Sequence, residues 1–124
     1  MTVQFEEKPI NMIKLIYLAA PYSHPDEKVR LQRFDAINKA AGNLIKSGRF
    51  VFSPISHSHP IAMVSDLPTG FDYWGDYDRR MVGHCDELFV LMLDGWEKSI
   101  GVQVEIQIAK CFGKPISYIG YTTE

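Results

Sequence analysis

Short apolar segments rich in β-branched residues alternate along this chain with longer segments of helical periodicity. Residues 13–19 form the first strand-like segment, and residues 87–93 form the most apolar one. Between such segments, apolar side chains recur every three or four positions, as in helices that bury one face. Strands that alternate with helices predict parallel pairing, with helices on both faces of the sheet. We therefore expect an α/β fold, a three-layer, Rossmann- or flavodoxin-like sandwich with a parallel sheet of four to five strands.

Turn-forming and capping residues set the expected boundaries of these elements. Ser23 or His24 is placed to cap a first helix, with Pro25 at its first position. Gly48 is placed to end that helix in a left-handed conformation. Residues 55–70 contain no clear periodicity, so we expect a long irregular segment of the kind that often serves function. Strands are predicted at residues 13–19, 49–53, 87–93 and 115–119, and further helices at residues 73–84 and about 100–112.

Length and charge limit the classes of function. The 124 residues suffice for one domain, expected at 13–124, after a polar segment 1–12 that we interpret as a loose leader. A net charge of -2 predicts no nucleic-acid surface, and no apolar run approaches the roughly 20 residues of a membrane helix. Cys85 and Cys111 lack metal or redox spacing, so we expect reduced core thiols and a cytoplasmic protein.

Glu105 is the most informative position because it interrupts an otherwise apolar helix. Gly101 lies one turn before it on the same face and Ala109 one turn after it. A carboxylate between two small residues is expected to face open space, and Gly101 also lets a ligand approach the backbone. Ser99 is placed to cap this helix, and its hydroxyl is a candidate substrate contact. The alternative is a solvent-facing glutamate beside polar neighbours, and the spacing alone does not decide between the two.

Asp78 is the second candidate carboxylate, on the predicted helix before the most apolar strand, and it competes with Asp72, Asp76 and Asp86 for that role. The alternative for Asp78 is a solvated helix face on which it pairs with Arg79 and Arg80. Tyr17 and Tyr22 bracket the end of the first strand. A buried tyrosine hydroxyl needs a partner, which a nearby carboxylate would supply.

Two histidines and two tryptophans are weaker candidates. His57 and His59 alternate along a segment that we expect to be extended, where they are candidate substrate contacts. A zinc site needs three or four converging ligands, so we expect no metal, and a metal-dependent hydrolase remains a minor alternative. Trp74 and Trp96 could each stack on a planar base, and core packing is the alternative for both. The sequence contains no dinucleotide fingerprint, Walker A motif or Gly-x-Ser-x-Gly elbow, so we expect no cofactor.

Two stretches carry more specific residue patterns. One is Ile16-Tyr-Leu-Ala-Ala-Pro21, and the other is Ser99-Ile-Gly-Val-Gln-Val-Glu105, in which Ser, Gly and Glu have fixed spacing. They resemble the opening strand and the signature helix of the nucleoside 2-deoxyribosyltransferase superfamily, over roughly residues 13–119. Asp78 falls where that family places a second carboxylate. The most similar members form a short branch related to the 2′-deoxynucleoside 5′-phosphate N-hydrolases.

The resemblance implies cleavage of the N-glycosidic bond of a nucleoside or nucleoside 5′-monophosphate, by hydrolysis or by transfer to another base. The residue matching Glu105 would attack the anomeric carbon, because a carboxylate there can stabilise an oxocarbenium-like charge or form a glycosyl ester. Asp78 would supply or position the proton for the leaving base. Tyr17 matches the tyrosine that orients the glutamate. The alternative is a non-catalytic nucleotide-binding or sensing module of the same fold.

The resemblance also bears on substrate and assembly. Ser99 matches a position that holds Ser in relatives acting on 5′-monophosphates, which favours a nucleotide substrate and hydrolysis. A phosphate would then bind at Ser23, His24, Arg30 or the backbone at the start of the first helix. The family completes its pocket across subunits, so we expect a homodimer or larger assembly. The candidate substrate-binding residues are Tyr22, Ser23, His24, Ser99, Gly101, His57, His59 and Trp96.

Overall fold

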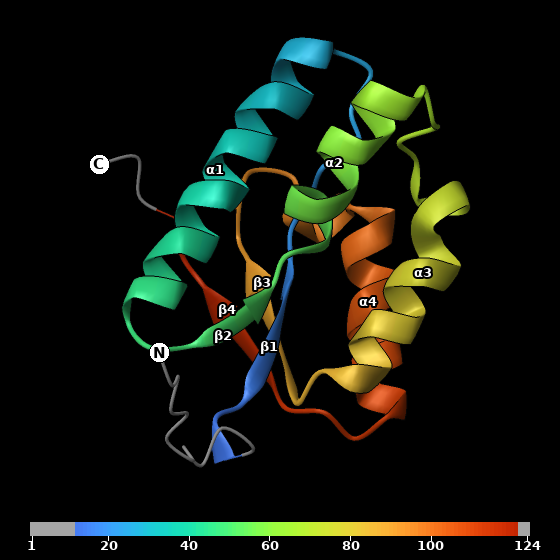
Figure 1. Cartoon of the computed structure of the whole chain (residues 1–124). Coiled ribbons are helices and arrows are strands. Elements are labelled where there is room, and N and C mark those ends of the chain that lie inside the picture. Colours follow the sequence, from blue (N-terminus) through green and yellow to red (C-terminus); the bar gives the residue numbers. More distant parts are fainter. Residues whose placement is uncertain (1–11, 122–124) are drawn as a thin grey trace, which may run out of the picture.

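In the part of the chain that the structure describes, four parallel strands form one sheet in the order β2-β1-β3-β4, with helices on both faces (Figure 1). The computed structural model describes residues 12–121, so all of the expected leader except Met12 lies outside the described residues. The predicted α/β sandwich is confirmed, with four strands. The strands are β1 (Leu15–Ala19), β2 (Phe50–Phe52), β3 (Glu87–Leu91) and β4 (Ile116–Ile119). The helices are α1 (Glu27–Lys46), α2 (Pro54–Ser65), α3 (Phe71–His84), the short 3₁₀ helix η2 (Trp96–Lys98) and α4 (Ile100–Cys111).

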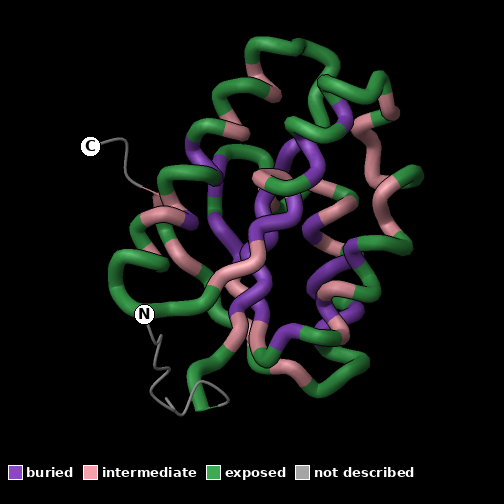
Figure 2. The backbone as a smooth tube through the Cα atoms, in the orientation of Figure 1, coloured by how far each residue is buried: buried purple, intermediate pink, exposed green. Residues whose placement is uncertain are grey.

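The sheet separates two apolar clusters. On one face Ile37 of α1 packs with Leu18 of β1, and on the other Val82 of α3 and Val102 of α4 pack with Tyr17. Neighbouring residues of β1 therefore serve opposite clusters, as strand geometry requires. Figure 1 shows α1 on one side of the sheet and α3 and α4 on the other, and Figure 2 shows that burial concentrates on the strands between them.

The strand order positions a site at one end of the sheet. The chain passes from β1 outward to β2, then returns to the other side of β1 to form β3, so the order reverses between β1 and β3. Tyr17 of β1 pairs with Phe52 on one side and with Leu88 on the other. In parallel sheets, ligands bind beyond the carboxyl ends of the strands at such a reversal.

The first helix begins later than predicted. Asp26 is the N-cap of α1, and its carboxylate accepts a hydrogen bond of 2.9 Å from the Lys28 N–H. The prediction of Ser23 or His24 as the cap is wrong, because the His24 ring instead accepts a hydrogen bond from the Asp26 N–H at 3.0 Å and shapes the turn before the helix. Gly48 has a φ of 95° after the last turn, which confirms the predicted helix end.

Helix α2 occupies most of the segment predicted to be irregular, so that prediction is wrong. Pro54 stands at the start of the helix, where its fixed φ is favourable. Pro54, Ser58 and Ala62 are buried at intervals of four, which is the spacing of one helix face. That face packs toward α1 and β1. Pro60 lies inside the helix on its exposed side.

The thiols differ in their surroundings. Both cysteines are free, and Cys85 is buried whereas Cys111 is exposed at the end of α4. The prediction of a core thiol is confirmed for Cys85 and wrong for Cys111, which lies on the outer face of its helix. Within residues 12–121, no helix has the length and apolar character needed to cross a membrane.

Candidate active site

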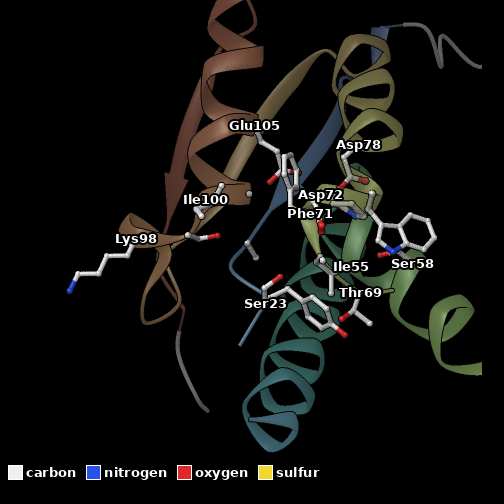
Figure 3. A pocket seen from close by; sticks show the side chains of 17 residues that line it. Ser23, Ile55, Ser58, Thr69, Phe71, Asp72, Asp78, Lys98, Ile100 and Glu105 are labelled. Carbon is white, nitrogen blue, oxygen red and sulfur yellow. The ribbon is translucent and has the colours of Figure 1, made fainter. Parts of the chain in front are cut away.

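A cavity of about 520 Å³ lies beyond the carboxyl ends of β1, β2 and β3 (Figure 3). Its walls come from the loop after β1, the first turn of α2, the start of α3, and the segment from η2 into α4. These segments are far apart in the sequence and meet because their strands are neighbours in the sheet. The residues lining it are Ala20, Tyr22, Ser23, Pro54, Ile55, Ser58, Thr69, Gly70, Phe71, Asp72, Trp74, Asp78, Lys98, Ser99, Ile100, Gly101 and Glu105.

Glu105 is a buried carboxylate at this cavity. Its side chain is 4% exposed, so the interpretation as a solvent-facing glutamate is wrong. The hydroxyl of Tyr17 donates a hydrogen bond to Glu105 Oε2 from the neighbouring strand β1. Ser99 caps α4 as predicted, because its Oγ accepts a hydrogen bond of 3.3 Å from the Val102 N–H.

The protonation of Glu105 is set by opposing effects. Burial raises the pKa of the Glu105 carboxyl to about 8, and the negative charge of Asp78 adds to the increase. The hydrogen bond from Tyr17 acts in the other direction, because it stabilises the ionised carboxylate. Burial and the nearby carboxylates raise the pKa of Tyr17 well above its usual value, so this hydroxyl stays a donor at neutral pH.

Asp78 supplies a second carboxyl group from α3. It is 6% exposed, so the interpretation as part of a solvated face with Arg79 and Arg80 is wrong. Burial raises the pKa of Asp78 to about 7. Glu105 and Asp78 reach the same cavity from two helices (Figure 3). Two carboxyl groups with raised pKa values in one cavity can hold a single proton between them near neutral pH, which suits acid–base chemistry.

The two small neighbours of Glu105 have different surroundings. Ala109 is fully buried in the apolar cluster under the sheet, so no open space lies on that side. Gly101 lines the cavity, but a Cβ atom added to it would lie 3.2 Å from Phe71 Cδ2. The expected open space therefore lies only toward the start of α4, and the ring of Phe71 bounds it.

Four of the predicted substrate-binding residues line the cavity, and His59 lies directly behind one of them. The four are Tyr22, Ser23, Ser99 and Gly101. The Tyr22 hydroxyl and His59 Nδ1 share a hydrogen bond.

His59 is buried and does not line the cavity. Its ring lies against Phe34, with ring centroids 4.2 Å apart. Burial and the charge of Arg30 lower the pKa of His59, which keeps the imidazole neutral. His59 therefore supports Tyr22 from behind.

Three further predicted contacts lie away from the cavity. His24 is exposed in the turn before α1. His57 lies on the exposed face of α2, with its ring stacked on Tyr77 at 5.5 Å. Trp96 packs on Tyr118, with ring centroids 5.5 Å apart. His57 and His59 are two residues apart, so helix α2 turns them to different faces, whereas an extended segment would have placed both on one face.

Metal-ligating side chains do not cluster in the described part of the chain. Between residues 12 and 121, no group of three or more His, Cys, Asp or Glu side chains is arranged to hold an ion. The polar side chains that line the cavity are mainly carboxyl and hydroxyl groups. The carboxyl groups belong to Asp72, Asp78 and Glu105, and the hydroxyl groups to Tyr22, Ser23, Ser58, Thr69 and Ser99.

The start of α3 contributes three wall residues, of which sequence reasoning missed Phe71 and left Asp72 and Trp74 as weaker candidates. Phe71, Asp72 and Trp74 all line the cavity. The indole N–H of Trp74 donates a hydrogen bond of 2.8 Å to the Pro68 carbonyl, which fixes the ring. The signal in the sequence is Gly70 followed by Phe71 and Trp74, which are three residues apart, as on one face of a helix. That signal is hidden when residues 55–70 are taken as one long loop.

Comparison with known proteins supports the same architecture. The solved structure of a 2-deoxyribosyltransferase from the psychrotolerant bacterium Bacillus psychrosaccharolyticus superposes with a TM-score of 0.57 at 23% sequence identity. The match covers 89% of this chain and 74% of that chain, and shows that the two proteins share a fold. A family model described as Domain of unknown function (DUF1937) matches residues 14–121. No curated protein matches this sequence.

Proposed function

The chain belongs to the DUF1937 domain family, and we propose that it cleaves the N-glycosidic bond of a nucleoside or nucleoside 5′-monophosphate, with Glu105 as nucleophile. The observation that carries the proposal is the position of Glu105. It is buried at the cavity, accepts a hydrogen bond from the Tyr17 hydroxyl, and shares the cavity with Asp78. The fold shared with a 2-deoxyribosyltransferase supports this class of reaction.

In the proposed reaction, Glu105 attacks the anomeric carbon of the sugar and forms a glycosyl ester. The N-glycosidic bond breaks, its electron pair goes to the base, and Asp78 supplies the proton that the base takes up. Asp78, now a carboxylate, then takes a proton from water or from a second base as that molecule attacks the anomeric carbon. The ester bond breaks, its electron pair returns to Glu105 as a carboxylate, and Asp78 is protonated again. The reactive state needs Glu105 ionised and Asp78 protonated, which is one proton for the pair. Because the pKa of Glu105 (about 8) lies above that of Asp78 (about 7), this is the minor arrangement of that proton, and the hydrogen bond from Tyr17 favours it.

Tyr17 acts on Glu105 during this sequence. Its hydrogen bond favours the ionised carboxylate and fixes the orientation of Oε2, so the other oxygen is left for the sugar. Tyr17 is itself fully buried in the core, which holds the phenol in place.

The charges around the cavity favour a free nucleoside over a 5′-monophosphate. Asp72, Asp78 and Glu105 all line it. Among the described lining residues, Lys98 has the only cationic side chain, and it is exposed and extends away from the cavity (Figure 3). A phosphate dianion would therefore face carboxyl groups without a cationic partner, which is unfavourable in a partly buried site.

The two arginines near the loop after β1 donate hydrogen bonds to backbone carbonyl groups. Arg33 donates hydrogen bonds to the carbonyls of Ser23 at 2.9 Å and Asp94 at 3.2 Å. Arg30 donates to the carbonyls of His24 and of Pro25, the latter at 3.3 Å. These hydrogen bonds stabilise the loop after β1. They also occupy guanidinium N–H groups that a bound phosphate would need as donors. We therefore place the free nucleoside ahead of the nucleotide that Ser99 alone favoured.

The test is incubation of the protein with matched pairs of nucleosides and their 5′-monophosphates, followed by chromatography for free base. We expect release from nucleosides, at least about tenfold slower release from monophosphates, and none above background with Glu105→Gln. Glu27→Gln, at the exposed start of α1, is the matched control and should keep wild-type activity. Base release that survives Glu105→Gln contradicts the proposed nucleophile. Tight nucleoside binding without release would assign the cavity to the alternative, a binding or sensing module.

We also propose a homodimer or larger assembly. Ile100, Val104 and Phe112 are large apolar residues exposed along α4 and its end, where a second copy would bury them. Sedimentation that finds only monomer at micromolar concentration would contradict this.

A further inference from the structure

Two glycines on different helices approach the same aromatic ring. A Cβ atom added to Gly75 of α3 would lie 3.1 Å from Phe71 Cε1, and one added to Gly101 of α4 would lie 3.2 Å from Phe71 Cδ2. Both distances are tighter than ordinary van der Waals contact, so neither position accepts even a methyl group without moving the ring. Glycine is less favourable than alanine within a helix, so the presence of Gly75 and Gly101 at opposite edges of the Phe71 ring indicates that the ring needs this space.

The ring of Phe71 stands beside the proposed nucleophile. Phe71 is the first residue of α3, is half-buried and lines the cavity. Gly101, which one ring edge contacts, lies one turn before Glu105 on the same face of α4. Figure 3 shows Phe71 among the side chains that surround the space next to Glu105. Gly75 itself does not line the cavity, so its effect on a ligand must pass through the ring.

We propose that Phe71 is a positioning residue that holds the sugar of the substrate over Glu105, and that Gly75 and Gly101 form the slot that sets its ring back from the cavity. The inference rests on the proposed function for the identity of the ligand. The ring offers a flat apolar wall to the C–H groups of a pentose, a contact that aromatic side chains suit well. A methyl group on Gly75 would push the ring by a few tenths of an ångström toward Gly101, which lines the cavity. A methyl group on Gly101 would push the ring the opposite way and would itself project at the cavity wall.

A purely structural role for the glycines makes a different prediction. If Gly75 and Gly101 only allow α3 and α4 to pack closely, a methyl group should lower stability and leave the kinetics unchanged. If they set the position of the ring, Gly75→Ala should change substrate binding while the favourable helix propensity of alanine offsets the crowding.

Gly83→Ala is the matched control, because Gly83 lies in the same helix and its added Cβ would meet Phe112 Cε2 at an ordinary 3.5 Å. With the nucleoside that the wild type cleaves fastest, we expect Gly75→Ala to raise KM by about three- to tenfold, with a smaller change in kcat, since sub-ångström misplacement is costly in an active site. Gly83→Ala should stay within about twofold of wild type. Equal kinetics for the two variants, in a wild type that releases base, would overturn the inference and leave the proposed function standing.

A double-mutant cycle adds a second test. Once Phe71→Ala removes the ring, Gly75→Ala should have no further effect on KM, so the two changes should be strongly non-additive. Additive effects would overturn the inference. Crystal structures of the two glycine variants should show the Phe71 ring displaced only in Gly75→Ala, and an unmoved ring would overturn it as well. A wild type that releases no base from any nucleoside overturns the proposed function instead.

Discussion

The hydroxyl of Tyr17 donates a hydrogen bond to the carboxylate of Glu105, which joins strand β1 to helix α4 across 88 positions of sequence. Tyr17 lies in the centre of the sheet, between Phe52 and Leu88 on the neighbouring strands. A fully buried residue at the centre of the sheet therefore holds the group that we propose to be the nucleophile.

Tyr17→Phe should weaken the nucleophile without removing it. The hydrogen bond lowers the pKa of Glu105, so its loss raises that pKa further and leaves less carboxylate at neutral pH. We expect kcat/KM at pH 7 to fall by about tenfold, as for loss of one hydrogen bond to a charged group, and to recover partly at higher pH. Tyr73→Phe, at an exposed position of α3, is the control. An unchanged pH profile for Tyr17→Phe would show that Tyr17 does not act on Glu105.

The pH dependence of base release should be bell-shaped. Burial raises the pKa of Asp78 to about 7 and that of Glu105 to about 8, and the two groups titrate as a pair. The pair lacks an ionised nucleophile when it holds two protons, and it lacks an acid when it holds none. We expect kcat/KM to peak between pH 7 and 8. A profile that stays flat from about pH 6 to 9 is incompatible with this pair as the catalytic groups.

The same carboxyl groups should make the fold less stable as pH rises. Each carboxyl group has a higher pKa in the folded chain than in the unfolded chain. At a pH between the unfolded and the folded pKa of a group, the folded state therefore binds more protons, and the free energy of unfolding falls as pH increases. This contribution is fully present below the ordinary carboxyl pKa and is lost as pH rises through about 8 for Glu105. Thermal melts from about pH 5 to 8.5 should show Tm falling for the wild type and a flatter curve for Glu105→Gln. Parallel curves for the two proteins would contradict it.

The cysteines should differ in reactivity. Burial raises the pKa of Cys85 to about 11, whereas Cys111 is exposed on α4. In the folded protein, a thiol reagent should modify Cys111 quickly and Cys85 only on unfolding. Mass spectrometry of the native protein after brief labelling should find one modification, which Cys111→Ser removes.

The sequence was sufficient for the sheet and for the two carboxylates. Alternating strand and helix patterns identified all four strands and three of the helices, because long apolar periodicities dominate local preference. Glu105 and Asp78 are conspicuous as acidic residues on faces that proved to be buried. The capping role of Ser99 followed from its position before an apolar helix.

The remaining parts depend on contacts that local sequence does not encode. Helix α2 contains Pro60 and two histidines, and it is helical because one face packs against α1 and β1. That packing moves His57 to the surface and places His59 behind Tyr22. Local sequence does not reveal the role of Phe71, because the space beside Gly101 of α4 is occupied by the Phe71 ring, which comes from α3.

The cap at Ser99 has a consequence for reactivity beyond stability. Glu105 follows it by six residues, and each residue of an α-helix turns the side chain by about 100°. A start displaced by a single residue would rotate the carboxylate out of reach of Tyr17 and of any sugar. The Ser99 hydroxyl at the start of α4 therefore helps to fix the rotation of the helix about its axis, and with it the direction in which the Glu105 carboxylate points.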